Sequence, residues 1–233
     1  MIKCVAFDLD NTLWDIDPVI EKAEQRFYQW LNSYYPKITR KYSDRALIKH
    51  RMAYMQSQPE TLRHDLTLLR KSWMKHLADD VGLDYSFVEN GFEIFWLARN
   101  EVTFYTDALE TLENLSKRYT LGVISNGNAS VHHIGIGHLF DYALSSEVAG
   151  VAKPHQDIFH QAQKLSNVEA HETVYVGDDP RCDIVGAQNT GMKAIWYNPT
   201  LKPWPGGKVP FAVIRSLSEL QQRLERYNAT IEQ

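Results

Sequence analysis

The strongest constraint on the fold is a set of short, almost wholly apolar runs that recur along the chain and alternate with helical patterns. The runs are Ile2–Asp8, Leu121–Ser125, Thr173–Gly177, Ala194–Tyr197 and the weaker Phe211–Ile214. Continuous apolar character is typical of strands covered on both faces of a parallel sheet. Apolar residues recur at helical spacing in Asp107–Arg118, Gln156–Leu165, Ile184–Thr190 and Leu217–Leu224. This order predicts an α/β fold with a doubly wound, mainly parallel, Rossmann-like sheet.

The alternation is interrupted between residues 17 and 100, where no convincing strand occurs. The helical patterns in this stretch are Pro18–Leu31, Ser43–Met55, Leu62–Val81 and Phe87–Arg99. We therefore predict a helical insert at 17–100, placed after the first strand, and a core formed by 1–16 and 101–233. The aromatic side chains of the insert are expected mainly to fill its own core; they include Tyr28, Trp30, Tyr34, Tyr35, Tyr54, Trp73, Phe92, Phe95 and Trp96.

Composition narrows the cellular setting and the partners. The 233 residues are 44% hydrophobic and 23% charged, as is usual for globular proteins. The formal net charge of −4 gives no electrostatic reason to expect binding to nucleic acid or to a membrane surface. No apolar run approaches the roughly 20 residues that span a bilayer, and the N-terminus lacks a secretory pattern. The two cysteines, Cys4 and Cys182, have no CxxC spacing. We expect a reduced, cytoplasmic monomer or homodimer that binds neither nucleic acid nor membrane.

Polar and charged side chains gather at the ends of the predicted strands. They are Asp8, Asp10 and Thr12 after the first strand, Ser125 and Asn126 at the second, Lys153 after the short segment Tyr142–Ser146, and Asp178, Asp179 and Asp183 after the next. In open α/β sheets, ligands bind beyond the carboxyl ends of the strands. We therefore expect these side chains to converge on one site.

The charges at this rim suggest a metal ion. Asp8, Asp10 and Asp178 would repel one another in a partly desolvated site, and a hard divalent cation with oxygen ligands relieves that repulsion. A few protein ligands combined with water and substrate phosphate suit Mg²⁺. Lys153 adds a compact positive charge that can pair with both a carboxylate and a phosphate.

The same residues are suited to phosphoryl transfer, which needs mainly positioning and charge neutralisation. Asp8 would attack phosphorus, and Asp10 would protonate the leaving alkoxide and then deprotonate the hydrolytic water. Thr12 and Ser125 would offer hydroxyl donors to phosphate oxygens. Taken singly, such acidic and hydroxyl residues are common helix caps and turn residues, so the interpretation depends on their occurring together.

The motifs resemble those of one known family. Asp8–Thr12 reads DxDxT, Ser125 ends the second strand, Lys153 precedes a proline, and Gly177–Asp183 reads GDDxxxD. Four motifs in this order, each at a predicted strand end, resemble the haloacid dehalogenase superfamily over most of the chain. In that superfamily a helical insert after the first strand is a C1 cap, which closes over the site and selects the substrate.

The resemblance implies a role for each matching residue. Asp8, Asp10 and Lys153 would be catalytic; Thr12, Ser125, Asn126 through its backbone N–H, and Lys153 would bind phosphate; Asp8, Asp178 and the backbone carbonyl of Asp10 would bind Mg²⁺; Asp179 and Asp183 would support the metal ligands from behind.

Within the superfamily, the chain is most similar to a bacterial, YigB-like group of phosphatases. The similarity lies in Phe7–Trp14, His64-Asp65, Ser125–Asn128 and Val176–Asp179. It implies a small phosphorylated metabolite as substrate, either FMN or the phosphoribitylamino-pyrimidine of riboflavin synthesis. The aromatic side chains of the insert offer modest support, since a flavin ring would stack on one or two of them. The alternative is another sugar or nucleotide monophosphate.

Two other functions agree less well with this sequence. A haloacid dehalogenase needs no acid for a phosphate leaving group, and its motif lacks the second aspartate that Asp10 supplies here. A phospho-aspartate receiver module binds Mg²⁺ in a similar acidic pocket. Receivers are about half this length and have no helical insert after the first strand.

Overall fold

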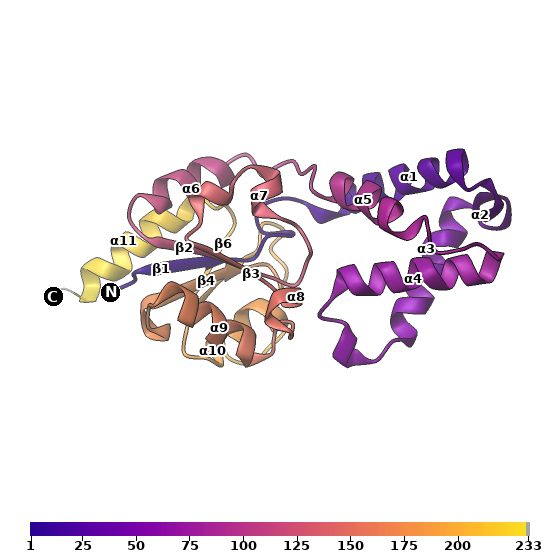
Figure 1. Cartoon of the computed structure of the whole chain (residues 1–233). Helices are drawn as coiled ribbons and strands as arrows, with labels where there is room; N and C mark the ends of the chain where they lie inside the picture. The colour runs from indigo at the N-terminus through magenta and orange to yellow at the C-terminus, as the bar shows by residue number, and fades with distance from the viewer. Residues whose placement is uncertain (232–233) are drawn as a thin grey trace. The chain divides into compact units, whose positions relative to one another are not determined.

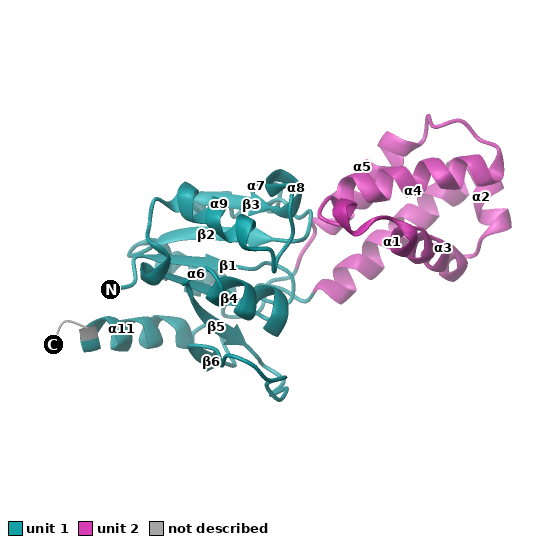
Figure 2. Ribbon diagram, turned by 90° about the horizontal axis from the view of Figure 1, so that it is seen from below, with its two compact units in different colours: residues 1–15, 103–233 teal, residues 16–102 magenta. Residues whose placement is uncertain are grey.

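A computed structural model describes residues 1–231 (Figure 1). The chain divides into two compact units, Met1–Asp15 with Thr103–Gln233 and Ile16–Val102 (Figure 2). We call the first the core unit and the second the helical unit. The helical unit begins one residue before the predicted insert, 17–100, and ends two residues after it.

The core unit is built on one six-stranded sheet in the order β3-β2-β1-β4-β5-β6. The strands are β1 Cys4–Phe7, β2 Thr120–Ser125, β3 Tyr142–Ser145, β4 Thr173–Gly177, β5 Lys193–Tyr197 and β6 Ala212–Ile214. Every pairing between these strands is parallel. The predicted α/β fold with a doubly wound sheet is confirmed, because the chain builds outward from β1 to β3 on one side and from β4 to β6 on the other.

Helices cover both faces of this sheet. The helical segments of the core unit are α6 Ala108–Ser116, α7 Val131–Ile134, η2 Gly137–Leu139, α8 Ser146–Ala149, α9 Gln156–Ser166, η3 Ala170–Glu172, η4 Pro180–Val185, α10 Gly186–Gln188 and α11 Glu219–Ile231. Helices α6 and α11 lie on one face, and α9 and α10 on the other (Figure 1). All four residues of β1 are buried, which explains why their side chains are apolar.

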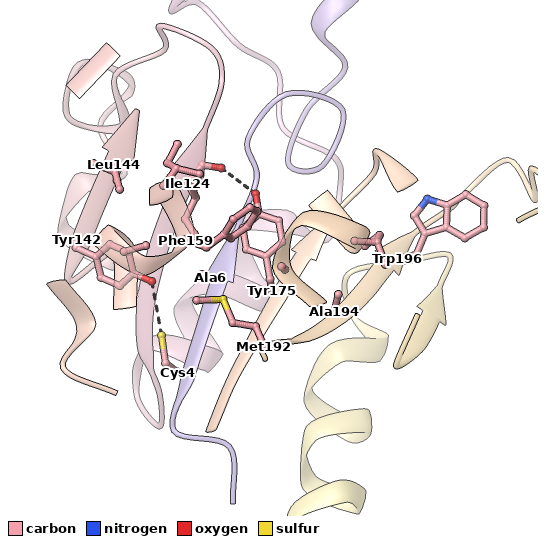
Figure 3. Close-up of a cluster of buried hydrophobic side chains, with 14 residues drawn as sticks. Cys4, Ala6, Ile124, Tyr142, Leu144, Phe159, Tyr175, Met192, Ala194 and Trp196 are labelled. Carbon is pink, nitrogen blue, oxygen red and sulfur yellow. Dashed lines mark hydrogen bonds between the residues drawn. The ribbon is translucent and has the colours of Figure 1, made fainter. Parts of the chain in front are cut away.

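A hydrophobic cluster fills the space between the sheet and α9 and α10. Its buried members are Cys4, Ala6, Ile124, Tyr142, Leu144, Ile158, Phe159, Ala162, Tyr175, Ile184, Ala187, Met192, Ala194 and Trp196 (Figure 3). The Cys4 thiol lies 3.8 Å from the Tyr142 hydroxyl, and burial raises the pKa of the thiol to about 11. Cys4 and Cys182 are both free thiols.

The helical unit has a core of its own. Its segments are α1 Ile16–Tyr34, α2 Pro36–Lys41, α3 Asp44–Ser57, η1 Glu60–Leu62, α4 Leu66–Val81 and α5 Val88–Arg99. Of the aromatic residues expected to fill this core, Trp73 and Phe95 are buried, and Tyr28, Trp30, Tyr35, Tyr54 and Phe92 pack against them. Tyr34 is an exception because 71% of it is exposed. No helix among residues 1–231 is both long and apolar enough to cross a membrane.

Some predicted helix boundaries are wrong, for local reasons. The predicted helix Ile184–Thr190 is replaced by a π-helical segment, η4, that begins at Pro180 and leads into α10. The Asp179 side chain caps this earlier start by accepting hydrogen bonds from the backbone N–H groups of Arg181 and Cys182. Helix α4 begins at Leu66 rather than Leu62, because the Asp65 carboxylate accepts a hydrogen bond from the Leu68 N–H.

Candidate active site

The sheet order brings the predicted strand-end residues together. Strand β1 lies between β2 and β4, so Asp8 after β1 has Ser125 on one side and Asp178 on the other. This is the point at which the sheet reverses its direction of winding, where open α/β sheets bind their ligands. Lys153 reaches the same place from the segment between α8 and α9.

Lys153 is the centre of a buried hydrogen-bond network. Only 4% of this residue is exposed. Its ammonium donates to Asp8 Oδ1 at 2.6 Å, to Asp183 Oδ1 at 2.7 Å and to the Tyr175 hydroxyl at 2.8 Å. Burial acts to lower the pKa of Lys153, but the charges of Asp183 and Asp8 outweigh it and hold the pKa above its ordinary value. The ammonium has three N–H donors, so all of them are used within the protein.

Three carboxylates surround this ammonium. Asp8, Asp178 and Asp183 each offer an oxygen, and these oxygens lie within 4.8 Å of one another. Burial raises the pKa of Asp8 well above its usual range, despite the opposing charge of Lys153. Burial and then the charge of Asp183 raise the pKa of Asp178 to about 7. One ammonium cannot neutralise all three carboxylates when they are ionised.

This excess fits a divalent cation. When all three carboxylates are ionised, their charge exceeds that of Lys153 by two units. No cationic side chain of the described residues forms an ion pair with Asp178. Carboxylate oxygens are ligands that Mg²⁺ prefers.

Both carboxylate oxygens of Asp183 accept hydrogen bonds within the protein. Its Oδ1 accepts from Lys153, and its Oδ2 accepts from the backbone N–H of Asp179 at 2.9 Å. The close approach depends on Gly177 at the end of β4, because a Cβ there would lie 2.4 Å from the carboxylate carbon of Asp183. The glycine of the GDDxxxD motif therefore has a packing reason. The Asp179 side chain caps η4 instead.

Asp10 lies outside the carboxylate triad. Its half-buried side chain accepts a hydrogen bond from the indole N–H of Trp14, with 2.8 Å between Nε1 and Oδ1. The loop between them is a tight turn in which Asn11 adopts a φ of 60°, and the Asn11 N–H donates to the Trp14 carbonyl at 2.7 Å. The Asp10 carboxylate therefore lies outside the triad and against Trp14, although its charge still acts to raise the pKa of Asp8.

The residues predicted to bind phosphate lie in different environments. Ser125 is 3% exposed, and its hydroxyl accepts from the Gly127 N–H at 3.0 Å. Thr12 is fully buried, and its hydroxyl has no hydrogen-bond partner among the described residues. The Asn126 side chain accepts from the Lys153 N–H at 2.7 Å and donates to the Lys153 carbonyl at 3.0 Å. Asn126 thus fixes the backbone from which the lysine projects.

Tyr175 is a member of the network that the sequence analysis did not identify. Its hydroxyl accepts from Lys153 and donates to the Ile124 carbonyl at 2.8 Å, at the edge of the hydrophobic cluster (Figure 3). Burial and then the charge of Asp183 raise the pKa of this phenol well above its ordinary value. The available signal was a hydroxyl-bearing residue in the middle of a strand, β4, that is buried throughout.

Comparison with known proteins identifies the family. The model of the haloacid dehalogenase-like hydrolases matches residues 2–191. The chain belongs to this family. The predicted resemblance to the haloacid dehalogenase superfamily is confirmed, and so is the resemblance to its YigB-like group. The chain is 31% identical to the 5-amino-6-(5-phospho-D-ribitylamino)uracil phosphatase YigB of Escherichia coli, over 94% of each chain. It is 30% identical to a glyceraldehyde 3-phosphate phosphatase of Pyrococcus abyssi, over 84% of this chain and 82% of that one.

A similar solved structure is named for a different reaction. The crystal structure of a 2-haloacid dehalogenase from Pseudomonas syringae pv. tomato is 39% identical, with a TM-score of 0.91 over 97% of this chain and 100% of that one. The proteins similar to this haloacid dehalogenase-like hydrolase thus include some named for phosphate esters and others named for haloacids. The reaction must be decided from the residues of the site.

Proposed function

We propose that this hydrolase is a Mg²⁺-dependent phosphatase that cleaves small phosphate monoesters through an aspartyl-phosphate on Asp8. The observation that carries the proposal is the contact between Lys153 Nζ and Asp8 Oδ1, 2.6 Å long, beside the carboxylates of Asp178 and Asp183. It occupies one oxygen of Asp8 and leaves Oδ2 to act as nucleophile. Phosphoryl transfer depends mainly on such positioning and charge neutralisation.

The reaction has two steps. In the first, Asp8 Oδ2 attacks phosphorus, the bond from phosphorus to the leaving oxygen breaks, and the alkoxide takes a proton from Asp10. In the second, water attacks the phosphorus of the aspartyl-phosphate and gives its proton to Asp10. Inorganic phosphate leaves, and Asp8 returns to its carboxylate form. Lys153 holds Asp8 in place throughout, and its positive charge offsets part of the negative charge of the phosphate.

The metal would be held by Asp8, Asp178 and the backbone carbonyl of Asp10, with Asp183 and Asp179 supporting them. Bound there, Mg²⁺ would neutralise charge on the phosphate and on the carboxylates. Burial, together with neighbouring carboxylates, raises the pKa values of Asp8 and Asp178, and a bound cation would oppose both effects. Thr12, Ser125 and the backbone N–H of Asn126 are the proposed phosphate contacts.

For the substrate we propose FMN or the phosphoribitylamino-pyrimidine of riboflavin synthesis. This choice is supported by the likeness to YigB over 94% of each chain. The likeness to a glyceraldehyde 3-phosphate phosphatase supports the alternative, a sugar or nucleotide monophosphate. We assign the helical unit, residues 16–102, the role of a C1 cap that selects among them.

Dehalogenation is the second candidate, because a protein of known structure that is 39% identical in sequence to this chain is named a 2-haloacid dehalogenase. Asp10 favours the phosphatase. A halide ion leaves without a proton, whereas an alkoxide needs one, and a positioned carboxyl supplies it. The excess negative charge of the triad also favours a cation, which phosphate binding needs.

The test is to measure phosphate release from a panel of phosphate esters that includes FMN, and halide release from 2-haloacids, with the same purified enzyme. We expect phosphate release that stops with EDTA and returns with Mg²⁺, and no halide release. Asp8→Asn should lower kcat to below about one thousandth while the fold is kept. Halide release without phosphate release would reject the phosphatase. FMN among the poorest esters would reject only the substrate assignment.

A further inference from the structure

The proposed acid and base, Asp10, must point one particular oxygen at the leaving group. One side chain that bears on this is Trp14, whose Nε1 lies 2.8 Å from Asp10 Oδ1. We propose that Trp14 is a positioning residue that fixes the Asp10 carboxyl so that Oδ2 carries the proton to and from the substrate. The inference rests on the proposed function, because it assigns a task to Asp10 in that reaction.

Trp14 is held firmly enough to act as a fixed reference. Its side chain is fully buried. The indole packs edge to face against Phe104, with 5.6 Å between ring centroids and an angle of 81° between the planes. The backbone of Trp14 forms one bridge with Asp10 and another with Phe104. A buried ring with this packing has little freedom to rotate, so its N–H points in one direction.

The chemistry of the contact selects an oxygen. An indole N–H is a donor only, so Asp10 Oδ1 must be the acceptor in every protonation state. A carboxyl oxygen that accepts this hydrogen bond is the poorer site for the acidic proton, which favours Oδ2. The hydrogen bond from Trp14 would thereby exclude carboxyl orientations in which the proton points away from the leaving oxygen.

Both neighbours of Trp14 lie, along the chain, close to the points where the core unit is interrupted by the helical unit. Asp10 belongs to the segment that leaves the core unit at Asp15, and Phe104 to the one that re-enters it at Thr103. The backbone hydrogen bond from Tyr105 N–H to the Leu13 carbonyl, 2.9 Å long, ties these segments together. The orientation of Asp10 therefore depends on packing between two stretches that are distant in sequence.

The test uses the dependence of the rate on the leaving group, because a general acid matters most when the leaving group is a strong base. We would measure kcat/KM for an alkyl phosphate and for p-nitrophenyl phosphate with wild type and with Trp14→Phe. For the alkyl phosphate we expect a loss of about tenfold or more, through kcat rather than KM. For p-nitrophenyl phosphate, whose leaving group needs little protonation, we expect a loss of less than about threefold.

The matched control is Trp204→Phe. Trp204 has a buried indole nitrogen with no hydrogen-bond partner among the described residues, so the same substitution there removes no hydrogen bond. We expect both rates to stay at the wild-type level. A second variant keeps the packing of Trp14 itself: a benzothiophene in place of the indole has the same shape without the N–H, and it should reproduce the selective loss.

Epistasis supplies a further readout that a purely structural role would not give. In an Asp10→Asn background, Trp14→Phe should cause no additional loss for the alkyl phosphate. Equal losses for both leaving groups, no loss in the benzothiophene variant, or additive losses with Asp10→Asn would each overturn the inference. If wild type releases phosphate from neither ester, it is the proposed function that fails. An active wild type without selectivity in the variants rejects only the role of Trp14.

Discussion

At the residue scale, the Lys153 ammonium connects three side chains of the site. Its three donors join the nucleophile Asp8, the supporting Asp183 and the buried hydroxyl of Tyr175. The Asn126 side chain holds the backbone of Lys153 through both its N–H and its carbonyl. Because each acceptor satisfies a buried positive charge, removing one would leave a donor unpaired at a cost of about 1–3 kcal/mol. The remaining imbalance is negative and resides mainly at Asp8 and Asp178.

This imbalance predicts how pH and Mg²⁺ act on stability. The pKa of Asp178 is raised to about 7 in the metal-free protein, so between its unfolded value of 3.8 and about 7 the folded state binds more protons than the unfolded state. Stability should therefore fall as pH rises through this window, by up to about 1.4 kcal/mol per pH unit. Mg²⁺ binds the ionised form, so it should raise the melting temperature more at pH 8 than at pH 6. Thermal melts with EDTA or Mg²⁺ check this; a larger metal effect at pH 6 would contradict it.

At the scale of elements, the end of β4 and the start of η4 form one unit of structure. Gly177 ends the strand, Asp179 caps the following segment, and Asp183 folds back against the glycine. The predicted helix from Ile184 was wrong because its apolar pattern indicates only the buried side of the segment. The cap formed by Asp179 decided where the segment begins.

Gly177→Ala tests this junction. The new Cβ would lie 2.4 Å from the carboxylate carbon of Asp183, so Asp183 must shift and weaken its hold on Lys153. We expect the free energy of unfolding to fall by about 1–3 kcal/mol and kcat by at least about tenfold.

Gly135→Ala is the control for this substitution. A Cβ there meets nothing within 4 Å, although its φ of 95° strains an alanine. It should cost stability and leave kcat unchanged. Wild-type kcat in Gly177→Ala would show that the glycine is not needed to place Asp183.

On the scale of the whole molecule, each unit contains a hydrophobic cluster of its own. One lies wholly among residues of the core unit and the other wholly among residues of the helical unit. The ends of the core unit's two segments are held together by the backbone bridge between Trp14 and Phe104. A unit that has its own core and adjacent ends is expected to fold alone.

We therefore expect a chain in which Asp15 is joined to Thr103 by a short linker, without residues 16–102, to fold. Circular dichroism should show a mixed α/β spectrum and one cooperative thermal transition, which Mg²⁺ shifts upward. A spectrum of an unfolded chain, or a melt without a cooperative transition, would show that the core unit depends on the helical unit.

The sequence alone was enough to predict the class of fold, the positions of five of the six strands and the set of residues at their ends, whereas β3 was not predicted as a strand. It could do so because burial on both faces of a sheet demands continuous apolar runs, and parallel strands end at a common edge. The tertiary structure alone decided which neighbours meet. The order of the strands places β4 beside β1, which brings Tyr175 and Asp183 to Lys153 and leaves Asp10 with Trp14. Such contacts join residues far apart in the chain or turn on side-chain direction, and local periodicity carries no information about either.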